Sequence, residues 1–162
     1  GASLNYELIA KTYDSARVDL INDGGPMVPS NYAKDNRLQE FIDAWELSKV
    51  APQACTNCDT ELLGYLTTNF AAYPEATFAL LSHKEDEVIR EFLEVSGATL
   101  SAGHDSLKEV FNEAPNAHVF FQGGSGHTSF GQLSNSRVGE IDAMTFIRQM
   151  LSDDLAWSNV TP

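Results

Sequence analysis

The chain has 162 residues, of which 43% are hydrophobic, and this is enough for one globular domain with a substantial apolar core. Its 23 acidic and 10 basic residues give a net charge of −13, so we expect neither nucleic acid nor anionic membranes as partners. No segment approaches the roughly 20 consecutive apolar residues of a membrane span.

The first half of the chain is predicted to be helical around one short strand. Apolar residues recur at helical spacing, Asp35 and Asp59 are expected to cap helices, and Pro74 ends the last of them. A dense turn signal at 22–29 follows the strand. The predicted elements are a helix at 3–13, a strand at 17–21, a helix at 35–48 and a helix from 59 to about 73.

The second half alternates strands with helices. We expect Gly97 to stop one helix and His104 to precede the start of the next. The predicted elements are a strand at 76–82, helices at 86–96 and 105–113, a strand at 118–122 and a helix at 140–151. Strands that alternate with helices predict an α/β domain with a parallel sheet flanked by helices.

The two cysteines form one C-x-x-C motif, Cys55 and Cys58. A structural disulfide is favoured over a zinc half-site, a redox pair or free thiols. Zinc needs about four ligands, and no second motif of this kind supplies them. A redox pair needs a preceding strand, whereas residues 50–54 are typical of a loop. A disulfide implies an oxidising compartment, so we expect a secreted or periplasmic protein.

Three polar residues follow the predicted strands: Asp23, Asp86 and His127. The carboxyl ends of parallel strands meet at one edge of a sheet, where ligands bind. An acid after one strand and a histidine after a later one is also the order of the last two members of a Ser…Asp…His triad in α/β-hydrolases. We therefore predict a site at this edge.

His127 follows a glycine-rich loop and is predicted to be the general base, with Asp86 orienting its ring. The alternatives are a solvated loop histidine for His127 and a helix N-cap for Asp86. Glu85 and Glu87 compete with Asp86 for the orienting role. For Asp23 we favour a local role in its turn over a role in the site.

The other histidines and the nucleophile are less defined. His83 is a candidate cleft residue, His104 is expected at a helix start, and His118 is expected to be structural. Ser3 is the one nucleophile candidate, but it has no preceding strand and Asn5 stands where an elbow has its second glycine. No metal site and no cofactor are predicted.

Several segments together resemble the C-terminal half of the pectin-acetylesterase-like serine esterases, an α/β-hydrolase family. They are GASLNYE at 1–7, VDLINDGGP at 18–26, Trp45 with the Cys55–Cys58 loop, FALLSHKEDEVI at 78–89, VFFQGGSGHT at 119–128 and MLSDDLAWSNV at 150–160. The resemblance covers most of the chain and rests on the order and spacing of these segments.

The resemblance implies that residues 1–162 are one domain, the C-terminal part of an α/β-hydrolase, with a helical cap-like insertion at about 26–75. It aligns Gly1 with the last glycine of the family's G-x-S-A-G nucleophile element, so the serine is expected just upstream of this chain. His127 and Asp86 align with the triad histidine and acid. The oxyanion loop and the first strands of the family have no counterpart here.

The resulting hypothesis is part of a serine carboxylesterase that acts on a small-molecule or carbohydrate ester. The nucleophile would come from an N-terminal partner chain or from a protein of which this is a fragment. Alone, the chain is expected to be nearly inactive, because it lacks a nucleophile and an oxyanion hole. The alternatives are a non-catalytic binding or structural module with a hydrolase half-fold, and a hydrolase that uses Ser3.

Overall fold

The computed structural model describes residues 2–162, in which helices surround a three-stranded parallel sheet. Its three strands are β1 (Leu20–Asp23), β2 (Phe78–His83) and β3 (Ala117–Gln122), in the order β1-β2-β3. The predicted α/β class is confirmed at this level. The first strand begins three residues later and ends two residues later than predicted, because pairing with β2 begins at Leu20 and continues to Asp23.

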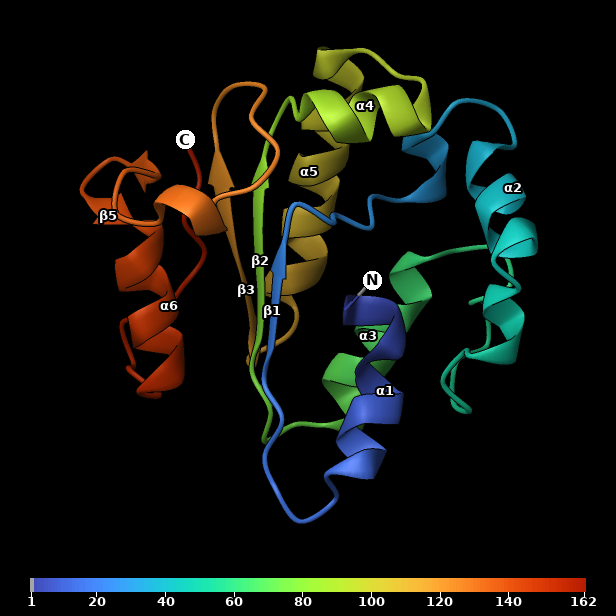
Figure 1. Cartoon of the computed structure of the whole chain (residues 1–162), viewed down its shortest axis with the longest axis horizontal. Coiled ribbons are helices and arrows are strands. Elements are labelled where there is room, and N and C mark those ends of the chain that lie inside the picture. The colour runs from blue at the N-terminus through green and yellow to red at the C-terminus, as the bar shows by residue number, and fades with distance from the viewer. Residues whose placement is uncertain (1) are drawn as a thin grey trace.

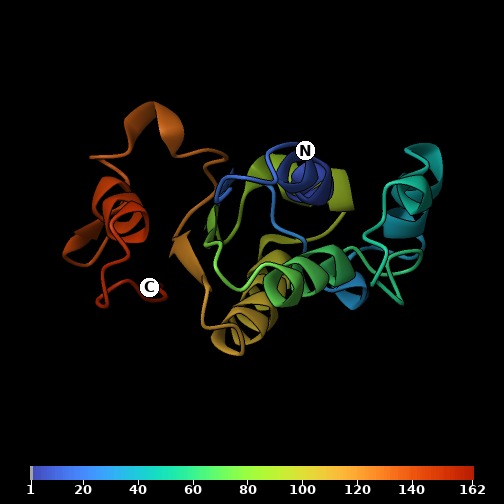
Figure 2. The same cartoon turned by 90° about the horizontal axis from the view of Figure 1, so that it is seen from below.

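Helices cover both faces of the sheet (Figure 1). One face packs against α1 (Ala2–Thr12), α3 (Leu63–Ala72) and α5 (Gly97–Asn112), and the other packs against α6 (Ala143–Leu151). The view from below shows α6, in red, on the side of the sheet opposite to α1 and α5 (Figure 2). Alternate strand residues point to opposite faces, so Leu80 joins the larger core and Leu81 joins the smaller one.

The segment between β1 and α3 is more broken than predicted. The helix expected at 35–48 is α2 (Arg37–Ala44) followed by a short 3₁₀ turn, because Glu46 adopts a left-handed conformation with φ of 51°. Asp35 is not its cap, since Asp35 itself has a positive φ of 44°. Asp59 does not cap α3 either, because α3 starts only at Leu63. In Figure 1, α2 stands at the edge of the molecule, away from the sheet.

Between β2 and β3 lie α4 (Glu87–Leu93) and α5. Asp86 is the N-cap of α4, as its sequence context allows. The predicted helix start near residue 105 is wrong, because α5 begins eight residues earlier, at Gly97, where Ser96 caps it through the Thr99 amide. Gly97 therefore begins a helix instead of ending one.

The C-terminal part closes the β3 edge. Two short antiparallel strands, β4 (Arg137–Val138) and β5 (Ile141–Asp142), precede α6. Asp142 caps that helix by accepting a hydrogen bond from the Thr145 amide. The tail then returns to β3, where Val160 exchanges backbone hydrogen bonds with Val119 and Phe121. No helix within residues 2–162 is long and apolar enough to cross a membrane.

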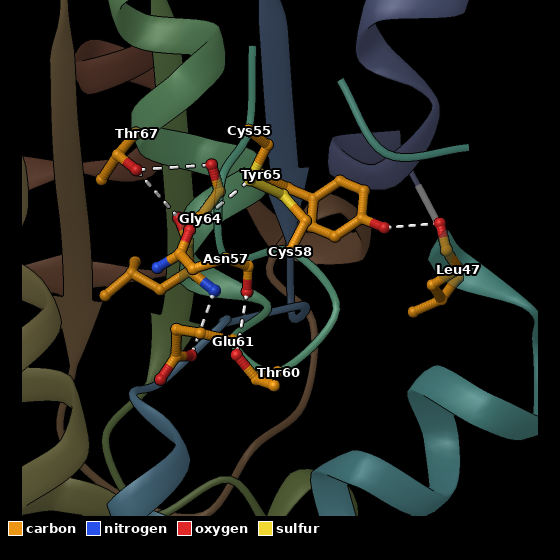
Figure 3. The surroundings of a disulfide bond; sticks show 10 residues. Leu47, Cys55, Asn57, Cys58, Thr60, Glu61, Gly64, Tyr65 and Thr67 are labelled. Atoms are coloured by element: carbon orange, nitrogen blue, oxygen red, sulfur yellow. Dashed lines mark hydrogen bonds between the residues drawn. A yellow bond between two sulfur atoms is a disulfide. The ribbon is translucent and has the colours of Figure 1, made fainter. Parts of the chain in front are cut away.

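Cys55 and Cys58 form a disulfide with each other between α2 and α3, so the predicted structural disulfide is confirmed (Figure 3). Cys58 is buried in the larger core. Nearby, Gly64 allows close packing: a Cβ there would lie 3.0 Å from the Cys55 sulfur. The Tyr65 hydroxyl donates a 2.6 Å hydrogen bond to the Leu47 carbonyl, which links α3 to the 3₁₀ turn after α2. A disulfide is consistent with an oxidising environment.

Candidate functional site

The loops that follow β2 and β3 are joined side by side at the carboxyl edge of the sheet. Three backbone hydrogen bonds of 2.8 to 3.1 Å connect them: the amides of Lys84, Glu85 and Glu87 donate to the carbonyls of Gln122, Gly124 and Ser125. These three amides therefore keep hydrogen-bond partners beyond the ends of the strands. This pairing holds the loop that carries Asp86 in register with the loop that carries His127.

Asp86 and His127 form the central contact of the site. The Nδ1 atom of His127 lies 2.9 Å from Oδ2 of Asp86, and the Asp86 side chain has no exposed surface. The other oxygen, Oδ1, accepts a hydrogen bond of 3.0 Å from the Ile89 amide. Asp86 thus caps α4 with one oxygen and holds His127 with the other, so the two roles considered for it coexist.

This geometry fixes the tautomer that a general base needs. With Nδ1–H donated to the carboxylate, Nε2 of His127 is left as the acceptor. Within residues 2–162, Asp86 is the hydrogen-bond partner of the His127 ring. The His127 side chain is 39% exposed, so the ring is accessible to a substrate. A buried carboxylate can stabilise the imidazolium that forms when Nε2 takes a proton.

Asp23 acts on the histidine loop and not on its own turn, contrary to our preferred interpretation. Its carboxylate accepts the backbone amide of Ser129 at 2.8 and 2.9 Å and the amide of Phe130 at 2.8 Å. These donors lie more than 100 residues away in the sequence. Asp23 therefore anchors the segment that leaves His127 to the end of β1.

Gly24 lets that loop approach closely. It has a φ of +78°, and a Cβ at this position would lie 2.6 Å from the carbonyl oxygen of His127 and 3.1 Å from its Cε1. An L side chain is strained at such a φ, and here it would also meet backbone. Glycine at this position is thus required by both the turn and the contact with His127.

Ser3 and His83 are placed differently from the central pair. Ser3 is buried in the first turn of α1, where its hydroxyl accepts a 2.8 Å hydrogen bond from the Asn22 side chain. His83 lies beside the glycine loop, with its Nδ1 3.4 Å from the Gly123 carbonyl oxygen. A Cβ on Gly126 would lie 2.7 Å from the His83 ring. The structure thus brings Asp86 and His127 together, with Asp23 behind them, and gives Ser3 a different partner.

His104 is a second histidine with a side-chain partner, Ser82, and both residues are buried. His104 does not start a helix but lies within α5, where its Nδ1 is 3.0 Å from the Leu100 carbonyl oxygen. Its Nε2 is 3.0 Å from the Ser82 hydroxyl, and neither residue is exposed. Burial lowers the pKa of His104 from 6.5 to about 4. His104 is therefore a neutral core residue inaccessible to substrate.

His118 is half-buried against Trp157, and burial also lowers its pKa.

An apolar pocket of about 300 Å³ opens beside His127. Its walls come from the first turn of α1, the chain after β1, α2 and α4. Of the described residues, no group of three or more His, Cys, Asp and Glu side chains is arranged to hold a metal ion. The Asp86–His127 pair offers proton transfer next to this apolar cavity.

Sequence reasoning missed the roles of Asp23 and Gly24 and the pocket residues on α2 and α4. The signal for the first two was present in the sequence Asn22–Pro26, whose Asp ends β1 and whose first Gly follows it directly. Turn chemistry explained both residues locally, and only the chain path shows that they meet the histidine loop.

No protein-family model, curated protein or solved structure matches this chain.

Proposed function

We propose that this chain supplies the acid and the histidine of a serine carboxylesterase with an α/β-hydrolase fold. The observation that carries the proposal is the 2.9 Å contact between Nδ1 of His127 and the buried Asp86, at the carboxyl edge of a parallel sheet. A buried carboxylate on Nδ1 and an accessible ring are the two features that a general-base histidine needs.

In the proposed reaction, Nε2 of His127 takes the proton of a serine hydroxyl as its oxygen attacks the ester carbonyl. His127 then gives this proton to the leaving alcohol, which breaks the ester C–O bond and leaves an acyl-serine. In the second half, His127 takes a proton from water, whose oxygen attacks the acyl carbon. The acid is released, and the proton returns to the serine. Asp86 stays ionised throughout and stabilises the imidazolium.

The serine is proposed to lie on a segment outside the described residues. Ser3 has its own partner in Asn22, and the His127 ring contacts Asp86. Gly1, which the resemblance aligns with the last glycine of a nucleophile element, is also outside the described residues. The proposal accordingly includes a nucleophile that comes from a partner chain or an adjoining segment. The disulfide supports placing the protein in a secreted or periplasmic setting.

Hydrolysis of p-nitrophenyl acetate by the purified protein, with any polypeptide that co-purifies, tests the proposal. A gel and an intact mass establish whether the 17.7 kDa chain is alone. A fluorophosphonate probe then identifies the polypeptide and the residue that carry the activated serine. The expected result is hydrolysis that His127→Ala abolishes, with partial recovery on adding imidazole.

His118→Gln is the matched control, because His118 lies on β3 away from the loop and packs against Trp157. This variant should keep the wild-type rate. The lone chain is expected to be inactive, so the deciding sample is the protein together with the partner chain or adjoining segment that supplies the serine. If that folded sample neither hydrolyses the ester nor reacts with the probe, the pair of residues has no catalytic use, and a non-catalytic module is the better description. Labelling at Ser3 would place the nucleophile within this chain instead.

A further inference from the structure

The pocket beside His127 is built almost entirely from apolar groups. Buried Leu4, Val28 and Leu93 line its inner wall, while Trp45 and Val88 line it with about half of their surface exposed. Of the described residues that form the lining, His127 is the one with an ionisable side chain. The protein has a net charge of −13, yet the described lining of this cavity next to the candidate base contains no Asp, Glu, Lys or Arg side chain.

The pocket walls are tied to each other, so the cavity is pre-formed. Phe41 of α2 and Phe92 of α4 stack with ring centroids 3.7 Å apart. The Arg37 side chain donates a 3.0 Å hydrogen bond to the Phe92 carbonyl, and the Lys34 amide donates to the Leu93 carbonyl at 3.2 Å. Pre-formed apolar cavities bind ligands without first having to order their walls.

The size and the chemistry of the cavity together identify its occupant. At about 30 Å³ per water-sized group, a pocket of about 300 Å³ takes a chain of roughly six to ten carbon atoms. Recognition of a sugar would need several polar side chains in the wall, and here only His127 and the indole N–H of Trp45 are polar. An acidic polysaccharide would in addition be repelled by the net negative charge of the protein.

We propose that this pocket binds the unbranched alkyl chain of an ester, about eight carbons long, so that the ester group lies at His127. The placement of the ester group at His127 rests on the proposed esterase function. The binding of the alkyl chain in the pocket does not, because it needs no catalysis. The same chemistry would serve an alkyl chain on the acyl side or on the alcohol side of the ester. Val88 and Trp45 would contact the part of the chain nearest the pocket mouth.

Binding is tested first with octanamide, a neutral compound that is not an ester, and with acetamide as its short counterpart. Amide and methyl resonances of the protein are followed by NMR during both titrations. Octanamide should shift the resonances of Val88, Ile89 and His127 at concentrations at which acetamide shifts none of them. If octanamide leaves these resonances unchanged up to its solubility limit, the pocket proposal is overturned.

Val88→Gln tests the wall, and Val50→Gln is its matched control. Both valines are about half exposed, at 49% and 48%, but only Val88 lines the pocket. Glutamine is uncharged and suits a helix, so it leaves the electrostatics of His127 unaltered. Val88→Gln should weaken octanamide binding about five- to tenfold, whereas Val50→Gln should not change it. Trp45→Ala is the second variant if Val88→Gln fails to fold, and it should also weaken binding.

Rates with p-nitrophenyl esters from two to ten carbons, and with alkyl acetates of the same lengths, complete the test. The series whose chain enters the pocket should gain about fourfold in kcat/KM per methylene up to about eight carbons. The other series should show little dependence on length, which identifies the side of the ester. Octanamide binding without any ester hydrolysis, in a sample that includes the partner chain or adjoining segment with the serine, would refute the esterase function and uphold the pocket. Hydrolysis in which the shortest ester is the best substrate in both series would uphold the esterase function and refute the pocket.

Discussion

Asp86 holds His127 with one carboxylate oxygen and caps α4 with the other. A helix N-terminus carries a partial positive charge that favours an ionised carboxylate there. The same residue therefore fixes the position of the helix that lines the pocket and the orientation of the histidine beside it. The site and the pocket wall are mechanically joined through this one side chain.

Asp86→Asn separates these two roles. The amide oxygen can still cap α4, but an amide NH₂ facing Nδ1 favours the wrong tautomer of His127. We expect stability within about 0.5 kcal/mol of the wild type and a loss of ester hydrolysis of about 10³- to 10⁴-fold. Urea unfolding and kcat/KM for p-nitrophenyl acetate are the measurements. An Asp86→Asn protein with more than a tenth of wild-type activity would exclude the orienting role.

Asp86→Ala removes both roles. It should cost a further 1 to 2 kcal/mol of unfolding free energy, because the Ile89 amide then loses its acceptor. Asp142→Ala provides the control, since Asp142 caps α6 through Thr145 on the opposite face of the sheet. That variant should lose about 1 kcal/mol of stability and no activity. Equal loss of activity in both alanine variants would mean that stability alone explains the effect.

Asp23→Ala should loosen the histidine loop. Its carboxylate is the acceptor for the Ser129 and Phe130 amides, and hydrogen bonds to a charged group are stronger than neutral ones. We expect about 1 to 3 kcal/mol of destabilisation and faster hydrogen exchange at these two amides. The exchange should change less in β2, at Leu80 for example. Unaltered exchange at Ser129 would show that another group anchors the loop.

The parallel sheet and the meeting of Asp86 with His127 could be predicted, because buried parallel strands have a clear apolar pattern and their ends share one edge. The boundaries of the helices could not be predicted from the sequence. Ser96 and Gly97 were compatible with the end of one helix or the start of the next, and the left-handed conformation of Glu94 decides between them by ending α4 first. The function of Asp23 depends on a contact with residues 106 positions away, which no local pattern contains.

Stability should fall in mild acid because of His104. The pKa of His104 is about 4 in the folded protein and about 6.5 in the unfolded chain, so the unfolded state binds the extra proton between these values. The stability is fully present above about pH 6.5 and is lost progressively as the pH falls toward 4, by roughly 3 kcal/mol in all. His104→Gln should flatten the dependence of unfolding free energy on pH between 6.5 and 5. An unchanged slope in that variant would locate the proton uptake elsewhere.

Gly24→Ala and Gly139→Ala form a matched pair for the close approach to His127. Both glycines have a positive φ, +78° and +58°, so each alanine variant should lose about 1 kcal/mol of stability from backbone strain. At Gly139 the new methyl group meets no atom within 4 Å, whereas at Gly24 it would lie 2.6 Å from the His127 carbonyl oxygen.

Only Gly24→Ala should therefore displace His127. It should lose at least 1 kcal/mol more stability than Gly139→Ala, shift the His127 resonances and reduce ester hydrolysis by at least tenfold. Gly139→Ala should keep full activity. Equal behaviour of the two variants in unfolding and in hydrolysis would show that the histidine loop can move away from β1 at no cost. The anchoring by Asp23 would then have to be weaker than its three short hydrogen bonds indicate.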